Sequence, residues 1–403
     1  MDLKSGYPFW AVRNGLMHAF PPLQDDLHCD VLVVGGGISG ALIADELSAH
    51  GHDVALIEQR DIGWGSTAAS TALLQYEIDT HLIELAQRHG EAAAALAYRA
   101  CAEALPQLAE VSAGLRGVDF RRMDSLYLAS RRRDVPVLQA EGQARRRHDL
   151  DARWLDGGAV QERFGVDAPG ALLTRQAARV DPYCLTYRLL ERVQRRGGRV
   201  HDRTVLHALQ PTARGVTART EGGQQIRSRH VILAQGYANQ DWLKVSVARN
   251  RSSYAMITDP LPADVLGPLS RTMVWESARP YLYLRTTGDG RVLVGGLDDR
   301  IDVPARRDRR VDSKARQLRK RLHQWFPQLQ ETLAFAWAGT FAETADGLPW
   351  FGPHEQWGPR VHFAMAYGGN GITYSMIGAG LLRAHVEGRS HPLKALFGFG
   401  RNA

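Results

Sequence analysis

The sequence has few cysteines, which limits the kinds of site it can form. Its three cysteines, Cys29, Cys101 and Cys184, lie far apart and form no Cys-x-x-Cys pair. This spacing argues against a disulfide framework and gives no zinc-binding pattern. We therefore expect no bound metal, and a reducing compartment fits the composition.

The sequence also lacks a long hydrophobic run. Its most apolar stretch, residues 31–47, contains several glycines and includes Asp45-Glu46 near its end. A membrane-spanning helix needs about 20 mostly apolar residues, and the first 30 residues contain no apolar core of a secretion signal. The pattern favours a cytoplasmic protein without an integral membrane segment.

Lysine is scarce, so the formal net charge of +7 comes almost entirely from arginine. The lysines are Lys4, Lys244, Lys314, Lys320 and Lys394. Arginine runs at 131–133, 145–147 and 306–310 would suit an RNA-binding surface, but Asp134, Asp149 and Asp308 sit in or beside them. Such mixed charge is typical of solvated faces, and we expect no nucleic-acid partner.

The chain has 403 residues, 44% of them hydrophobic, enough for about two domains. Near the N-terminus, the apolar run 31–34 predicts a buried strand. Residues 38–50 carry apolar side chains at helical spacing, and 54–57 predicts a second strand. A strand, a helix and a second strand within about 30 residues form one βαβ unit.

A glycine-rich turn joins the first strand to the helix of this unit. Its sequence, GGGISG over residues 35–40, is a GxGxxG motif, and an acidic residue ends the second strand. The glycines allow a tight turn, close approach of backbone to a pyrophosphate and close helix–strand packing, while the carboxylate binds a ribose. An acid here disfavours NADP and leaves NAD or FAD. From this unit we expect cofactor contacts by Gly35, Gly37, Ile38, Ser39, Gly40 and Glu58.

The rest of the chain predicts a second sheet. Residues 80–114, 183–196 and 313–326 have helical composition or spacing, and 120–130 and 361–366 are strand-like. Short strands at 272–275, 281–286 and 291–295, separated by turn residues, indicate an antiparallel sheet distinct from the nucleotide-binding part. The sequence therefore predicts an α/β protein with two sheets.

Residues 58–70 resemble the segment after the second strand in the D-amino-acid-oxidase superfamily. That group includes glycine oxidase, sarcosine oxidase and γ-glutamylputrescine oxidase. Residues 179–182 (RVDP), 234–236 (AQG), 346–352 (DGLPWFG) and 367–373 (YGGNGIT) are similar to further motifs of the family, so the resemblance covers nearly the whole chain.

The resemblance implies a Rossmann-type FAD-binding domain of the glutathione-reductase-like kind, with an inserted mixed or antiparallel β-sheet domain for the substrate. We expect an N-terminal extension over residues 1–28. The FAD-binding domain is expected to comprise residues 29–115, 155–248 and 336–403, and the substrate-binding domain residues 116–154 and 249–335.

The resemblance also implies further contacts to the cofactor. Residues after the second strand would wrap the pyrophosphate, Val205 would contact adenine, and the last glycine-rich loop would face the flavin. The implied residues are Gln59, Arg60, Gly65, Ser66, Thr67, Ser70, Thr71, Val205, Ala234, Gly236, Gly368, Gly369, Asn370, Gly371, Ile372 and Thr373. The flavin is expected to be non-covalent, because the stretch in which sarcosine oxidases carry an anchoring cysteine reads Trp337 to Phe341 here.

As its function, the resemblance implies oxidation of a C–N bond by hydride transfer to flavin N5, giving an imine that hydrolyses. Tyr283 is similar in position to a substrate-facing tyrosine of glycine oxidase, and Tyr281 and Arg285 share its face of the strand. Phe341 stands where amino-acid oxidases have a carboxylate-binding arginine, which favours an amine over a simple α-amino acid. We expect an aromatic wall and a nearby carboxylate for a second cationic group, formed by Phe341, Trp275, Tyr281, Tyr283 and either Glu276 or Glu343.

The electron acceptor stays open between oxygen and a quinone or carrier protein, since Leu293 stands where sarcosine oxidases have a lysine that promotes the reaction with oxygen. Three alternative functions also stay open. The chain could be a flavin-dependent C–O dehydrogenase, as for glycerol 3-phosphate or 2-hydroxy acids, an RNA-modifying flavoprotein, or a flavoprotein that only binds.

Overall fold

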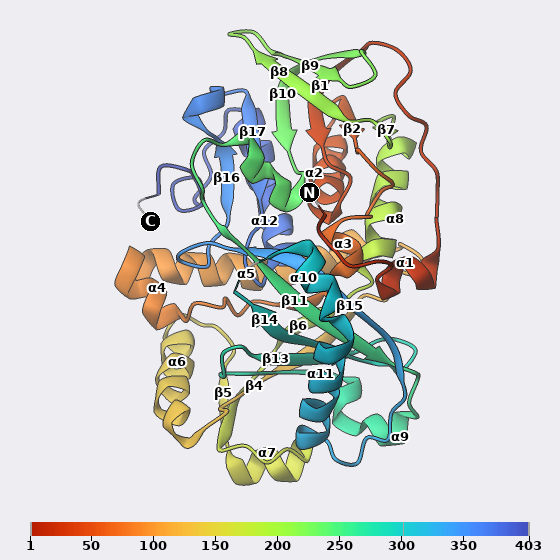
Figure 1. The fold of residues 1–403 in the computed structure, drawn as a ribbon. Coiled ribbons are helices and arrows are strands. Elements are labelled where there is room, and N and C mark those ends of the chain that lie inside the picture. The colour runs from red at the N-terminus through yellow and green to blue at the C-terminus, as the bar shows by residue number, and fades with distance from the viewer. Residues whose placement is uncertain (1, 301, 402–403) are drawn as a thin grey trace.

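The computed structural model describes residues 2–300 and 302–401, which form two β-sheets with helices packed around them (Figure 1). The first sheet has the strand order β16-β17-β10-β1-β2-β7, and β8 and β9 extend it from β10. Its strands are β1 (Leu27–Val34), β2 (Val54–Ile57), β7 (Arg199–His201), β8 (Leu206–Pro211), β9 (Val216–Thr220), β10 (Gln225–Leu233), β16 (Trp350–Pro353) and β17 (Val361–Met365).

The expected βαβ unit is present at the centre of the first sheet. Strand β1 pairs in parallel with β2 on one side and β10 on the other, and β17 continues the parallel order. These central strands are buried on both faces, which explains their continuous apolar sequences. The carboxyl ends of β1, β2, β10 and β17 consequently lie along one edge, where doubly wound sheets bind their ligands.

The second sheet has the order β15-β11-β14-β13-β12-β4-β6-β3, with β5 paired to β6. It is mixed, because β12 and β4 run parallel while the other pairs are antiparallel. Its strands are β3 (Leu73–Gln75), β4 (Arg121–Leu128), β5 (Arg153–Asp156), β6 (Gly170–Arg179), β11 (Arg249–Thr258), β12 (Thr272–Glu276), β13 (Leu282–Thr286), β14 (Val292–Asp299) and β15 (Leu333–Glu343).

The pairing of the second sheet differs from the expected division of the chain. Strands β3 and β6, and most of β15, come from segments expected in the FAD-binding domain, yet they belong to the second sheet. The physical reason is that these strands carry the chain from one sheet to the other. Strand β6, for example, leads through Asp181 into helix α8 (Pro182–Arg195). This helix packs against α2 (Ile38–Ala49), the helix that follows β1 of the first sheet.

The other helices surround the two sheets. Helices α2 and α12 pack on each other beside the first sheet, and α11 covers the second. The stretch 80–114, expected to be helical throughout, is broken by Gly90, whose φ of +84° lies in the left-handed region. The helices are α1 (Phe9–Asn14), α2 (Ile38–Ala49), α3 (Ser66–Ala69), α4 (Leu82–His89), α5 (Glu91–Ser112), α6 (Val135–Arg147), α7 (Gly157–Phe164), α9 (Ala263–Leu266), α10 (Pro304–Arg309), α11 (Val311–Trp325) and α12 (Gly371–Val386). Within residues 2–300 and 302–401, none of these helices has the length and apolarity needed to cross a membrane.

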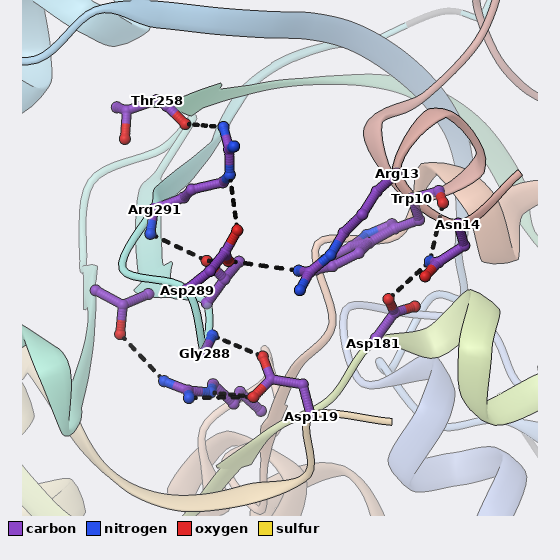
Figure 2. Close-up of polar contacts among 12 residues, drawn as sticks. Trp10, Arg13, Asn14, Asp119, Asp181, Thr258, Gly288, Asp289 and Arg291 are labelled. Atoms are coloured by element: carbon purple, nitrogen blue, oxygen red, sulfur yellow. Dashed lines mark hydrogen bonds and ion pairs between the residues drawn. The ribbon is translucent and has the colours of Figure 1, made fainter. Parts of the chain in front are cut away.

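The N-terminal segment, residues 2–14, ties the two sheets together. Lys4 forms a bridge with Gly339 at the edge of β15, and Trp10 is fully buried and donates from Nε1 to the Ser70 carbonyl at 2.7 Å. Figure 2 shows the contacts of α1: Asn14 donates to Asp181 at 2.8 Å, and Arg13 lies 3.4 Å from Asp289. The segment expected as an extension is therefore packed against both parts of the fold.

Two of the three arginine runs contribute to the core. Arg145 is fully buried, donates to Glu141 at 2.8 Å and lies against the rings of Tyr76 and Tyr98. Arg307 is also buried, where it donates to Thr340 at 2.9 Å. These arginines therefore hold the fold together and are not presented to a polyanion.

Candidate active site

A cavity of about 300 Å³ lies where the carboxyl edge of the first sheet meets the second sheet. Its size is within the range of ligand-binding clefts. One end is lined by the turn after β1, the end of β2 and Val205, and the other by Tyr281, Tyr283 and Phe341. The cavity is therefore long enough to join the expected nucleotide and substrate regions.

The glycines of the first turn are required by close contacts. Gly35 has a φ of +116°, and a Cβ there would clash with the Ala234 carbonyl. A Cβ on Gly40 would clash with the carbonyl oxygen of Gly35, so this glycine sets the approach of helix α2 to the turn. Gly37 precedes the first residue of α2, which leaves the helix N-terminus open to the cavity, a position suited to phosphate.

Glu58 lies at the end of β2 and lines the cavity. Its Oε2 accepts from Gly36 N at 2.7 Å, and its Oε1 accepts from Arg60 N at 2.9 Å. Burial raises the pKa of the carboxyl, and these backbone hydrogen bonds oppose that rise. The two oxygens are held in a fixed orientation at the position where the fold binds a ribose.

The segment after Glu58 folds across the start of α2. Thr67 Oγ1 accepts from Ile38 N at 2.9 Å, and Gly63 N donates to the Gly36 carbonyl at 2.9 Å. Ser66 lines the cavity, and its Oγ is shielded from water and has no hydrogen-bond partner. A buried hydroxyl without a partner costs free energy, and a phosphate oxygen of FAD would satisfy it, so the residues present fit this cofactor.

All the expected cofactor residues except Gly40 and Thr373 line the cavity. Gly40 lies behind the turn and acts through helix packing. Thr373 is buried in α12 and donates to the Gln75 carbonyl at 3.3 Å. Among the described residues, none of the three cysteines lines the cavity, and non-covalent attachment of the flavin stays a prediction.

The last glycine-rich loop lines the part of the cavity where we expect the flavin. Gly368 has a φ of +100° and donates from its N–H to the Ala342 carbonyl at 2.8 Å. Gly369 N donates to Asp79 Oδ2 at 3.1 Å, and Asn370 Nδ2 to the Glu77 carbonyl at 2.6 Å. Helix α12 begins at Gly371, so its N-terminus, which favours negative charge, faces the cavity.

Aromatic residues form the opposite end, as the sequence suggested. The rings of Tyr281 and Tyr283 are 5.5 Å apart, and Tyr283 covers Gly295, where a Cβ would clash with its ring. Trp275 stacks on Tyr127 with ring centroids 3.6 Å apart and donates to Ser125 at 3.0 Å. Trp275, Tyr281, Tyr283 and Phe341 all line the cavity.

Arg285 differs from its expected role. It shares the strand face of Tyr283, but Trp10 covers this part of the face, and the guanidinium is fully buried. It donates to the carbonyls of Thr71 and Val180 at 2.7 and 2.9 Å, so it joins backbone segments and does not line the cavity.

The two expected carboxylates also lie outside the cavity lining. Glu343 pairs with Arg251 at 2.8 Å across strands β15 and β11. Glu276 is buried, accepts from Ser130 at 2.9 Å and pairs with Arg321. Glu343 is thus paired across the sheet and Glu276 with Arg321 of α11, so both already have partners.

Two other carboxylates line the substrate end and were missed by the sequence analysis. Asp79 follows β3, and Asp298 lies near the end of β14. Burial raises the pKa of both, that of Asp298 to about 7. The predicted strand ended at Gly295, and the signal that could have extended the analysis is the Gly295-Gly296 pair, because glycines inside a strand often mark a bulge.

The chain is similar to known proteins along most of its length. Residues 30–384 match the DAO family, described as FAD dependent oxidoreductase. The chain is 25% identical over 391 residues to γ-glutamylputrescine oxidoreductase of Escherichia coli strain K12, covering 94% of this chain and 88% of that protein. It is 26% identical over 372 residues to glycine oxidase of Geobacillus kaustophilus strain HTA426, covering 89% and 93%.

Solved structures share the fold. The crystal structure of glycine oxidase from Geobacillus kaustophilus superposes with a TM-score of 0.77 at 21% identity, covering 94% of this chain and all of that one. L-amino acid deaminase from Proteus myxofaciens, in complex with anthranilate, gives a TM-score of 0.78 at 14% identity, covering 100% and 98%. The glycine turn, Glu58, the cavity and the match over residues 30–384 agree, and the chain belongs to the DAO family of FAD-dependent oxidoreductases.

Proposed function

We propose that this enzyme oxidises the C–N bond of a small amine whose reacting carbon carries no carboxylate. The observation that carries the proposal is the charge of the substrate end. The charged residues that line this end are Asp79 and Asp298, both acidic, whereas the other charged lining residues, Glu58 and Arg60, lie at the nucleotide end.

Arginine placement supports an amine over an amino acid. Recognition of a carboxylate usually uses a bidentate arginine. Phe341 stands in the family's arginine position and lines the cavity, and the guanidinium of Arg285 is bound to backbone carbonyls. Arg279, beyond the lining, lies over the ring of Tyr281 at 4.8 Å and is attracted by Asp79. Because the charged residues that line this end are Asp79 and Asp298, a positively charged substrate is favoured electrostatically.

The residues of this end suit an amine in two ways. The tyrosine and tryptophan faces exclude water and attract a cation, and the carboxylates fix its orientation. When bound, FAD supplies the two-electron acceptor for the hydride equivalent that leaves the carbon beside nitrogen. Among the relatives, the γ-glutamylputrescine oxidoreductase fits this reading by its name, whereas the glycine oxidase is named for an amino acid.

An anaerobic screen tests the proposal. The holoenzyme is mixed with putrescine, n-butylamine, glycine, D-alanine and the 2-hydroxy acid lactate, and loss of the flavin's visible absorbance is followed. We expect the amines to reduce the enzyme faster than the amino acids. Reduction by lactate alone would favour the C–O dehydrogenase, and faster reduction by glycine or D-alanine would overturn the amine assignment.

The same reduced sample identifies the electron acceptor. Leu293 is uncharged and stands where sarcosine oxidases have the lysine that promotes the reaction with oxygen. It is fully buried and does not line the cavity, so this position offers oxygen no cation. We propose that a quinone or carrier protein accepts the electrons. Faster reoxidation by a soluble quinone than by air supports this, and rapid reoxidation by air would make the enzyme an oxidase.

A further inference from the structure

Strand β14 contains a bulge beside the substrate end of the cavity. Ser252 of β11 pairs with Asp299 and Tyr254 pairs with Gly296, so Ser253 alone faces both Leu297 and Asp298. Leu297 has a φ of +57°, which is rare for a residue with a large side chain. Bulges of this kind redirect side chains and occur often next to active sites.

The bulge decides which face of the sheet each side chain takes. Before it, Leu293 packs in the core on the cavity side, while Val292 and Val294 pack with α11 on the other side. Unbroken alternation would place Leu297 toward the cavity and Asp298 toward α11. The observed arrangement is the reverse: Leu297 packs with Val292 and Val294, and Asp298 lines the cavity.

The redirected carboxylate lacks a full set of partners. Asp298 Oδ1 is inaccessible to water and accepts no hydrogen bond, and the side chain's hydrogen bond is with Ser253. Ser253 Oγ in turn lies 3.5 Å from the Tyr283 hydroxyl. An unsatisfied buried acceptor costs free energy. The bulge therefore carries two energetic costs, the left-handed backbone of Leu297 and the unpartnered Oδ1 of Asp298.

The charged groups around Asp298 do not neutralise it. Asp79 and Glu343 repel its negative charge. Lys314 attracts it, but the Lys314 ammonium already donates to the Leu297 carbonyl at 2.5 Å and to Asp299 at 3.0 Å. The nearby hydroxyls of Tyr281 and Tyr283 stay neutral, since burial raises the pKa of both. The site therefore has an unmet need for a cationic hydrogen-bond donor.

We propose that Asp298 receives the ammonium group of the substrate and takes its proton, leaving the neutral amine that can be oxidised. This inference rests on the proposed amine oxidation and names a catalytic residue for it. In the step, one N–H bond of R–CH₂–NH₃⁺ breaks and an O–H bond forms on Asp298, giving R–CH₂–NH₂ and the carboxylic acid. No electrons are transferred in this step, so it needs no additional reagent.

The burial of Asp298 is consistent with this role. It raises the pKa of the carboxyl to about 7, close to the value at which a general base works best near neutral pH. Ser253 is a hydrogen-bonding neighbour of the carboxyl, and Tyr281 and Tyr283 line the same cavity. Asp79 is the other acidic residue on the cavity side; burial raises its pKa, and its Oδ2 accepts from Gly369 N.

The first test measures binding and does not depend on turnover. tert-Butylamine carries an ammonium group but no hydrogen on the adjacent carbon, so it cannot be oxidised to an imine. Calorimetry of its binding to the holoenzyme at pH 6 to 9, in buffers of different ionisation enthalpy, reports proton transfer. We expect pH-dependent binding to the wild type and at least tenfold weaker binding to Asp298→Asn. Equal binding by both proteins, or no binding by either, would overturn the inference.

The second test uses the amine that reduces the wild type fastest in the screen. We expect kcat/KM of the wild type to rise with pH through about 7. In Asp298→Asn the substrate must arrive neutral, so the rise should move to the pKa of the amine itself, about 10. At pH 7 the loss should be about 100-fold or more. An unchanged profile would show that Asp298 is not the base.

Controls separate this inference from the proposed function. Asp264→Asn removes an exposed carboxylate on α9 and should behave as wild type. FAD content and melting temperature establish that Asp298→Asn is folded, and proton transfer on tert-butylamine binding can be measured on the wild type alone. If no amine reduces the wild type, the proposed function fails. If amines reduce it and Asp298→Asn keeps the wild-type profile, only the role of Asp298 fails.

Discussion

Single residues at the nucleotide end have roles that backbone geometry defines. Gly40 allows the N-terminus of α2 to approach the turn after β1, because any Cβ there would meet the Gly35 carbonyl oxygen. Gly380, in α12, has open space around its Cβ position. The two glycines therefore differ in what alanine should do, although both lie in helices.

We predict opposite effects for alanine at these positions. Gly40→Ala should displace the helix from the turn and greatly reduce FAD affinity, with a lower melting temperature. Gly380→Ala should leave FAD binding unchanged and stabilise the protein by about 0.5–1 kcal/mol, as alanine is the better helix former. Titration of apoprotein with FAD and thermal unfolding measure both. Wild-type affinity in Gly40→Ala would contradict the packing argument.

At the scale of elements, the N-terminal segment covers part of the cavity. Leu3 lines the cavity, and the ammonium of the buried Lys4 lies 3.8 Å from the ring centre of Trp64, which also lines it. Burial lowers the pKa of Lys4 to about 8. Helix α1 is held separately by Trp10 and Asn14. Residues 2–6 can therefore be removed while the anchor of the segment stays.

We predict that deletion of residues 2–6 speeds the dissociation of FAD by about tenfold, equivalent to about 1.4 kcal/mol, through loss of these covering contacts. The rate follows from the recovery of flavin fluorescence after dilution of the holoenzyme. The melting temperature of the apoprotein serves as the control for general destabilisation. An unchanged dissociation rate would mean that the segment does not retain the cofactor.

The elements near the N-terminus could be read from the sequence, and the reason is their strong local signals. The strand 54–57 and the helix starting at Ile38 agree with β2 and α2, because both faces of a central parallel strand are apolar and glycines mark the turn. The same local reasoning missed the break at Gly90 and the membership of β6 in the second sheet. Long-range pairing decides these features, and no short pattern encodes it.

The substrate end could be predicted only in part for the same reason. Alternation correctly grouped Tyr281 and Tyr283, which both line the cavity. It failed to exclude Arg285, since Trp10, distant in sequence, covers that position. Alternation also could not predict that the Asp298 side chain points into the cavity, because a bulge between β11 and β14 determines its orientation. Tertiary contacts therefore override the sequence pattern at the residues that we propose bind the substrate.

At the scale of the whole molecule, buried ionisable groups make stability depend on pH. On folding, the pKa of the Asp298 carboxyl rises from its ordinary value of 3.8 to about 7. The folded state thus binds its proton more tightly, so this contribution is fully present at low pH and is lost as pH rises from about 4 through 7. Two half-buried histidines act oppositely: partial burial lowers the pKa of His230 and His385 to about 4.

We predict that Asp298→Asn reveals the carboxyl's part of this dependence. The melting temperature of the Asp298→Asn apoprotein should exceed that of the wild-type apoprotein increasingly as pH rises from 5 to 8. The histidine contribution is common to both proteins and cancels in the difference. A difference that stays constant with pH would contradict a pKa near 7 for the carboxyl.

The most direct measurement of the central claim, an acidic substrate end that selects amines, is the rate of anaerobic reduction in stopped flow. Putrescine and glycine are compared at equal concentration, pH 8 and two ionic strengths. The account predicts at least about tenfold faster reduction by putrescine, with the advantage smaller at high salt because screening weakens attraction to Asp79 and Asp298. Faster reduction by glycine at both ionic strengths would contradict it.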